Sequence, residues 1–184
     1  MDENIAAGEG TGAGEGMSRR QALGYGGLAT AGLVASQLAA PSATAAERGG
    51  SLATRTISLA QAERVVRAAV RYVKRTGLPN MYVLVVDSCG DEKASARMDG
   101  NGAASVALVP IKAHTARSFG RSTAELAEGN TDAARIASLT TAGFSLLGGG
   151  RPIFEDGVLI GAIGVGGGTP DQDDQVAREA IEAL

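Results

Sequence analysis

The sequence predicts an α+β domain with an antiparallel sheet, and three observations lead to that class. Short apolar segments typical of strands occur in runs joined by hairpin turns. Helical periodicity occurs before, between and after these runs. The regular alternation of strand and helix that a doubly wound parallel sheet needs is absent from the sequence.

The first predicted element is a helix that begins after Ser58. Ser58 and Gln61 form a capping box, and apolar residues then recur at helical spacing until Gly77 ends the helix. Residues 81–87 are expected to form a buried strand. A short turn leads from it to a returning hairpin strand over residues 92–98.

The middle of the chain is expected to be helical. Residues 103–119 form one helical region, but Pro110 lies inside it and predicts either a kink or a division into two pieces. Ser122 and Glu125 cap a short helix, and residues 132–139 predict another.

Three more strands and a closing helix complete the expected fold. The strands are predicted over residues 144–147, 151–155 and 158–165, and the helix over residues 170–183. Glycines separate the first two of these strands, and Asp156 with Gly157 forms a hairpin turn between the last two. The sheet is therefore expected to have five strands.

Residues 158–175 combine a buried strand, a glycine turn and a tightly started helix. Gly161 and Gly164 carry no side chains within the strand, which predicts the close approach of another backbone or of a ligand. Thr169 and Gln172 form a capping box at the start of the helix. Three aspartates in the first turn and the absence of a G-x-x-x-x-G-K-[ST] motif argue against phosphate binding here.

Composition excludes several classes of function. The 184 residues carry a net charge of −3, which gives no electrostatic footprint for nucleic acid. The apolar stretches are too short to predict an ordinary membrane span. Cys89 is the single cysteine, so a disulfide within the chain is impossible, and the single histidine, His114, excludes a multi-histidine metal site within one chain.

The N-terminal part of the sequence predicts export. A Gly-rich acidic leader precedes the paired Arg19 and Arg20, a mild apolar stretch follows, and an A-x-A cleavage site ends at Ala45. We therefore expect a Tat-type signal with a disordered leader over residues 1–45, a flexible mature N-terminus over 46–57 and one domain over 58–184. The predicted location is extracellular, without a stable membrane anchor after cleavage. Met1 and Met17 both stay open as the start.

A set of short motifs in the predicted domain carries a family resemblance. In chain order they are RMDG (97–100), KAHTA (112–116), FGRST (119–123), GGRPI (149–153), GAIGV (161–165) and GGTP (167–170). Together they resemble the GlcG/HbpS family of haem-binding proteins. The resemblance covers nearly all of residues 58–184, and the export signal favours the exported, HbpS-like branch.

This resemblance implies a fold, an assembly and a function. The expected fold is a profilin-like α+β domain with a five-stranded antiparallel sheet flanked by helices, assembled into a homo-octamer. The expected function is extracellular binding of haem, with a role in iron handling or redox sensing and signalling through a sensor histidine kinase. Catalysis is not expected.

One candidate site residue follows from the resemblance, and the others follow from what haem needs chemically. Thr115 matches the family threonine linked to haem coordination, whereas His114 fills a variable place and is chemically the better iron ligand. Adjacent helical residues point about 100° apart, so the two are not expected to share one site. Lys112, Arg117 and Arg121 are candidates for the haem propionates, Phe119 for an apolar wall, and Met98 for an alternative pocket near residues 161–168.

Other interpretations stay open at this stage. His114 is also typical of an ordinary surface residue, and Thr115 of a residue that only packs a helix. A small-molecule enzyme on the same fold would use Lys112 or Asp99 for acid–base chemistry. A corrinoid-binding module on the same fold is the third alternative.

The export prediction has a direct test. Replacing Arg19 and Arg20 together by lysine should retain the chain inside the cell, because the paired arginines are what the Tat receptor recognises. Secretion is measured in the culture medium, where the unmodified chain should appear with a mass near that of residues 46–184. Normal secretion of the double variant would contradict the predicted location.

Overall fold

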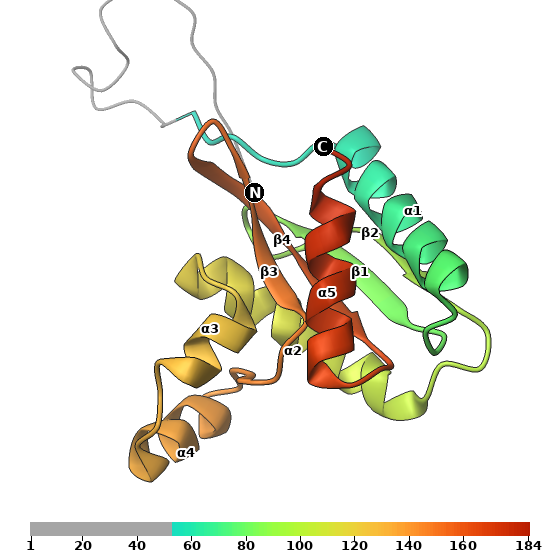
Figure 1. The fold of residues 1–184 in the computed structure, drawn as a ribbon. Coiled ribbons are helices and arrows are strands. Elements are labelled where there is room, and N and C mark those ends of the chain that lie inside the picture. Colours follow the sequence, from blue (N-terminus) through green and yellow to red (C-terminus); the bar gives the residue numbers. More distant parts are fainter. Residues whose placement is uncertain (1–52) are drawn as a thin grey trace, which may run out of the picture. The chain divides into compact units, whose positions relative to one another are not determined.

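The computed structural model describes residues 53–184. The predicted export signal lies outside these residues. The elements in chain order are α1 (Leu59–Thr76), β1 (Tyr82–Asp87), β2 (Glu92–Arg97), α2 (Ala103–Phe119), α3 (Thr123–Glu128), α4 (Ala133–Thr141), β3 (Gly150–Glu155), β4 (Val158–Gly166) and α5 (Pro170–Ile181) (Figure 1). Within this part of the chain, none of the helices has the length and hydrophobicity that a membrane crossing requires.

Local signals in the sequence explain where most helices begin. Ser58, Ser122 and Thr169 each accept a hydrogen bond from the backbone three residues later, and each is answered by a Gln or Glu side chain in a complete capping box. Pro110 lies inside α2, which is assigned as one helix, so the predicted division into two pieces is wrong. Pro110 has no N–H group, so the carbonyl of Val106 loses its partner within the helix.

The sheet has four strands in the order β2-β1-β4-β3, and all neighbouring strands are antiparallel. The α+β class is confirmed, and the expected fifth strand over residues 144–147 is wrong. Two backbone N–H groups of that segment bind side-chain oxygens instead of a neighbouring strand. Ser145 N donates to Thr115 Oγ1 at 2.9 Å, and Leu147 N donates to Ser145 Oγ at 3.2 Å.

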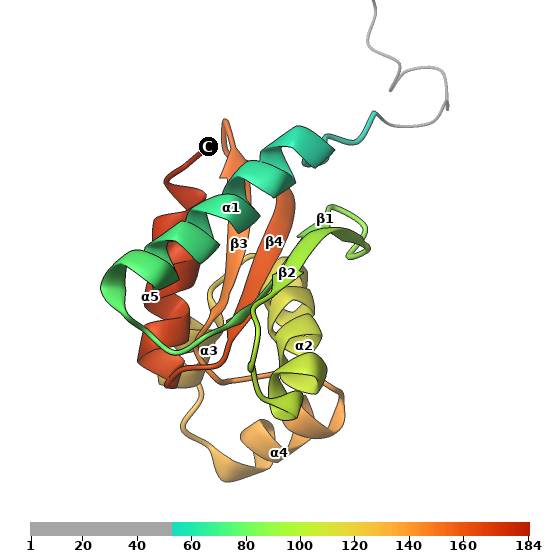
Figure 2. The same ribbon diagram turned by 90° about the vertical axis from the view of Figure 1, so that its right-hand side faces the viewer.

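Helices cover both faces of the sheet (Figure 2). Alternate residues of β1 point to opposite sides, so Val83 and Val85 join the core under α1 and α5. Leu84 and Val86 join a smaller core on the other face. That second core is built with α2, through Val109, Ala113 and Ala116.

Glycines in β4 allow α2 to lie against the sheet at backbone distance. A methyl group built at Gly164 would lie 2.4 Å from the carbonyl oxygen of Val109 and 3.0 Å from the amide nitrogen of Ala113. The backbone approach predicted for Gly164 is therefore confirmed, and the approaching group is a helix. At Gly161 the same methyl would meet the carbonyl oxygen of Val86 at 2.4 Å.

A buried ion pair joins three elements at the end of β4. Lys112 of α2 donates through Nζ to Asp173 Oδ2 at 2.7 Å and to the carbonyl of Val165 at 3.0 Å. Asp173, in the first turn of α5, also accepts a hydrogen bond from the amide of Gly168 at 2.9 Å. Both side chains of the pair are 4% exposed. The pair therefore links α2 to the end of β4 and to the start of α5.

Helix α4 differs from the other helices because it has no buried residue. It lies beside α3, away from the sheet (Figure 1). Its side chains therefore contribute little to the two cores, and its position depends on few contacts.

The close contact at Gly164 predicts a large effect of a small substitution. Gly164→Ala should lower the free energy of unfolding by about 1–3 kcal/mol, because the added methyl overlaps the α2 backbone, which cannot yield easily. Gly102→Ala is the control, since a methyl there meets nothing within 4 Å; Gly102 is the N-cap of α2, so the control should cost only the loss of a better cap, below about 1 kcal/mol. Chemical denaturation of both variants checks this. Equal stabilities would contradict the packing described for α2.

The buried ion pair predicts an asymmetric response to substitution. Lys112→Met should cost about 3–5 kcal/mol, because it leaves the Asp173 carboxylate buried without its cation. Adding Asp173→Leu should recover much of that loss, since no uncompensated charge then remains. Arg67→Met, which breaks an exposed pair with Glu63, is the control and should cost less than about 1 kcal/mol. A Lys112→Met cost no larger than the control's would contradict a tightly coupled pair.

Candidate functional site

Three of the residues predicted from sequence line one cavity. Thr115, Phe119 and Arg121 border a space of about 170 Å³ between the C-terminal half of α2, α3, α4 and the segment before β3. We call it the Thr115 cavity. Its remaining lining residues are Leu126, Gly129, Asn130, Arg135, Leu139, Phe144 and Leu146.

Thr115 is fully buried, and its hydroxyl is already hydrogen-bonded. Oγ1 donates to the carbonyl of Ile111 at 2.7 Å and accepts from the amide of Ser145 at 2.9 Å. A hydroxyl oxygen has two acceptor lone pairs, so one remains after the bond from Ser145. Thr115 therefore holds the segment after α4 in place. The remaining lone pair of its hydroxyl oxygen can still bind a ligand weakly.

The walls of the Thr115 cavity are apolar, and its rim carries two cations. The rings of Phe119 and Phe144 meet edge to face with centroids 5.0 Å apart. Arg121 lies 4.0 Å from Glu125, and both side chains are more than half exposed, so that pair holds the guanidinium weakly. Arg135 donates to the side-chain oxygen of Asn130. An apolar slot with two arginines at its edge is suited to a flat molecule with anionic groups.

His114 lies outside the Thr115 cavity. Its side chain is exposed and stacks on Phe144 with ring centroids 6.1 Å apart and planes 3° apart. A methyl built at Gly90 would lie 3.6 Å from Nδ1 of His114, so the imidazole covers the β1–β2 turn. The free thiol of Cys89 is exposed in the same turn. His114 and Thr115 thus face different surroundings, as their helical spacing predicts.

The other predicted site residues do not reach the Thr115 cavity. Lys112 is held in the ion pair with Asp173, and Arg117 donates to the carbonyl of Ser88. Met98 lines a separate hollow with Lys74 and Asn80, and it packs on the core under α1 and α5, whereas α2 covers the other face. The structure therefore brings three of the seven predicted residues together in this cavity.

Sequence reasoning missed the residues that complete this cavity. Phe144 belonged to the segment expected to be a strand, and Arg135 and Leu139 to a helix that was given no role in the site. A Phe between Gly143 and Ser145 carries no pattern that predicts a cavity wall. Among residues 53–184, no cluster of three His, Cys, Asp or Glu side chains is placed to hold a metal ion.

Comparison with known proteins places this geometry in context. A family model described as "HbpS-like: Haem degrading protein HbpS-like" matches residues 57–182. A crystal structure of a double mutant of HbpS from Streptomyces reticuli has 34% sequence identity and a TM-score of 0.67, covering 79% of this chain and 97% of that chain.

Two further relatives connect the chain to PduO. A crystal structure of a PduOC:heme complex has 31% identity and a TM-score of 0.64, covering 70% of this chain and 95% of that chain. The corrinoid adenosyltransferase PduO of Salmonella typhimurium is 32% identical over 131 residues, which are 70% of this chain but 39% of PduO. The chain therefore spans about two fifths of the length of this relative.

The family match covers the whole described domain from Ile57, whose amide binds the carbonyl of Ile160, to the end of α5. The four-stranded antiparallel sheet with helices on both faces agrees with the solved structures of that family. This chain belongs to the HbpS-like family of haem-binding proteins.

Proposed function

We propose that the chain is an exported haem-binding protein that handles haem or iron outside the cell or senses redox state. One observation carries the proposal: in a member of the HbpS-like family, Thr115, Phe119 and Arg121 line one cavity. The haem complex of the related PduOC supports haem as the ligand.

The chain's own residues suggest how haem would be held. In this proposal the remaining lone pair of Thr115 Oγ1 coordinates the iron. Phe119 and Phe144 supply the apolar walls. Arg121 and Arg135 are available for the propionates, because neither is held in a close ion pair. Haem would supply a redox-active iron at this place.

The size of the cavity sets a condition on binding. Its volume of about 170 Å³ is below the ~300–1,000 Å³ of pockets that enclose drug-sized ligands. Helix α4 supplies Arg135 and Leu139 to the lining and has no buried residue. Haem binding in this proposal therefore requires α4 to move outward, which breaks few contacts.

Export, assembly and signalling extend the proposal. The Tat-type signal supports an extracellular location, and the family resemblance supports a homo-octamer and a sensor histidine kinase as partner. Exposed apolar side chains at Val106, Phe119 and Leu147 support assembly, because contact between copies would remove them from water.

A corrinoid-binding module is the second candidate. The 32% identity to part of a corrinoid adenosyltransferase favours it over an unrelated small-molecule enzyme. Acid–base chemistry by Lys112 has less support, because its ammonium is buried and bound to Asp173 and Val165.

A hemin titration of the full chain tests the proposal. Thr115→Ala should shift the Soret band and weaken binding about tenfold or more, because both the donor oxygen and the anchor for Ser145 are lost. Thr115→Ser keeps the hydroxyl and is the matched control, and it should bind hemin nearly as the unmodified chain does. His114→Ala should leave the Soret band in place, since His114 lies outside the cavity.

Three results would contradict parts of the proposal. Loss of a nitrogen-ligand spectrum in His114→Ala would assign the iron to the imidazole. Unchanged spectra in both alanine variants would remove the site from the Thr115 cavity. Tight binding of cobalamin without any Soret shift from hemin would favour the corrinoid module.

A further inference from the structure

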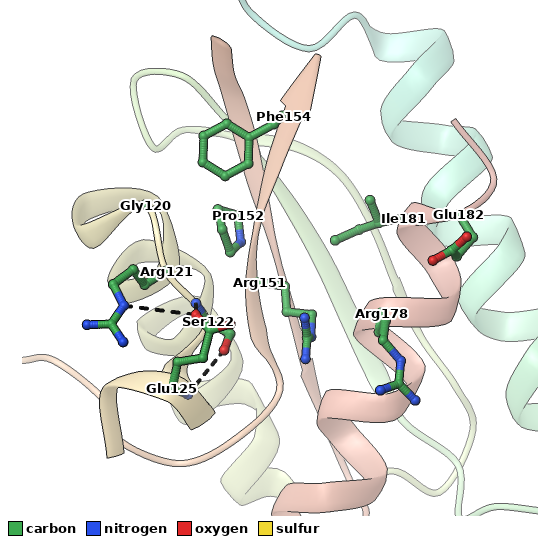
Figure 3. A pocket seen from close by; sticks show the side chains of 10 residues that line it. All are labelled: Gly120, Arg121, Ser122, Glu125, Arg151, Pro152, Phe154, Arg178, Ile181 and Glu182. Atoms are coloured by element: carbon green, nitrogen blue, oxygen red, sulfur yellow. Dashed lines mark hydrogen bonds and ion pairs between the residues drawn. The ribbon is translucent and has the colours of Figure 1, made fainter. Parts of the chain in front are cut away.

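A second hollow lies at the β3 edge of the sheet, between the start of α3 and the C-terminal half of α5 (Figure 3). Its volume is about 360 Å³, at the lower end of the range for small-molecule sites. We call it the Arg178 hollow. Its principal lining residues are Arg121, Arg151, Pro152, Phe154, Arg178 and Ile181.

One wall of the Arg178 hollow is apolar and stays open to water. Phe154 is 49% exposed although it belongs to a strand. A methyl built at Gly120 would lie 3.9 Å from the tip of the Phe154 ring, so the glycine leaves that side of the ring uncovered. Pro152 and Ile181 continue the apolar surface from β3 to α5 (Figure 3). This surface is suited to a flat apolar ring.

The charged residues of the hollow leave one cation without a partner. Arg151 is held by Asp174 in a two-point ion pair, with contacts of 2.7 and 3.0 Å. Arg121 is turned toward Glu125. Arg178 makes no ion pair with any residue of 53–184, and the Glu182 carboxylate, one turn later, lies apart from its guanidinium (Figure 3). Among residues 53–184, Arg178 is therefore the arginine of the hollow that makes no ion pair, whereas Arg151 is held closely and Arg121 weakly.

The edge strand itself does not accept a peptide. Gly150 N donates to Thr123 Oγ1 at 3.0 Å, so its edge amide is occupied, and Pro152 has no N–H group. An added strand could therefore accept no hydrogen bond from Gly150 or Pro152 in the first half of β3. The hollow is thus suited to a small molecule rather than to an added strand.

We propose that the Arg178 hollow binds a small monoanion with a flat apolar ring, of the aromatic carboxylate class. The Arg178 guanidinium donates two N–H groups to the carboxylate, while the ring lies against Phe154 and Pro152. Glu125 and Glu182 on the rim disfavour dianions such as phosphate esters. The hollow shares Arg121 with the proposed haem cavity, but the proposal rests on Arg178 and Phe154, which line the hollow and not that cavity.

Binding of 1-naphthoate to the ¹⁵N-labelled full chain tests the proposal, with the uncharged 1-naphthamide as the matched probe. Naphthoate should shift the amide signals of Gly120, Phe154 and Arg178, and naphthamide should bind several-fold more weakly. Arg178→Ala should weaken naphthoate binding about tenfold, because a charge-assisted hydrogen bond is lost. Arg64→Ala, an exposed arginine of α1, is the control and should change nothing.

Phe154→Ala gives a second, independent variant, and it should weaken both probes equally because it removes only the ring contact. Equal affinities for naphthoate and naphthamide would overturn the anionic part of the proposal. Shifts that map elsewhere, or an Arg178→Ala variant with unchanged affinity, would overturn the site. Circular dichroism of each variant checks the fold. We expect the fold to be retained, because Arg178 and Phe154 are both exposed.

Discussion

The seating of α2 on the sheet is the constraint on which the rest of the domain depends. Gly164 lets the helix backbone touch β4, and the Lys112–Asp173 pair fixes the helix to β4 and α5 at the same level. Lys112 donates to two groups that are far away in sequence, so its position also sets the rotation of α2 about its own axis. Because both the distance of α2 from the sheet and its rotation are set, each face of the helix has fixed surroundings.

That rotation decides which candidate ligand is inside. Thr115 follows Lys112 by three residues and shares its buried face, whereas His114 lies on the exposed face against the β1–β2 turn. The imidazole of His114, the stronger iron ligand, therefore lies outside the Thr115 cavity. The hydroxyl of Thr115, the weaker one, lines it. His114 thus adds an imidazole to the exposed face of α2, while Thr115 lies on its inner face.

Features that depend on neighbouring residues could be predicted from the sequence. Features that depend on contacts between residues far apart in the sequence could not. Three capping boxes located helix starts, and Gly164 predicted a close approach, because both signals act within a few residues or at one backbone position. The extra strand was predicted wrongly because nothing near residues 144–147 reveals that Thr115 captures the Ser145 amide. The ion pair of Lys112 was not predicted for a similar reason, since its partner Asp173 is 61 residues away.

The lack of two free backbone donors at the edge of β3 affects self-association. An open-ended stack of sheets needs two accepting edges in every copy, one for each neighbour. In this domain Thr123 occupies the Gly150 amide and Pro152 has no N–H group, so the first half of the β3 edge offers neither of these donors. Growth of one continuous sheet from copy to copy is therefore hindered at this edge, because an added strand would lack those two backbone hydrogen bonds.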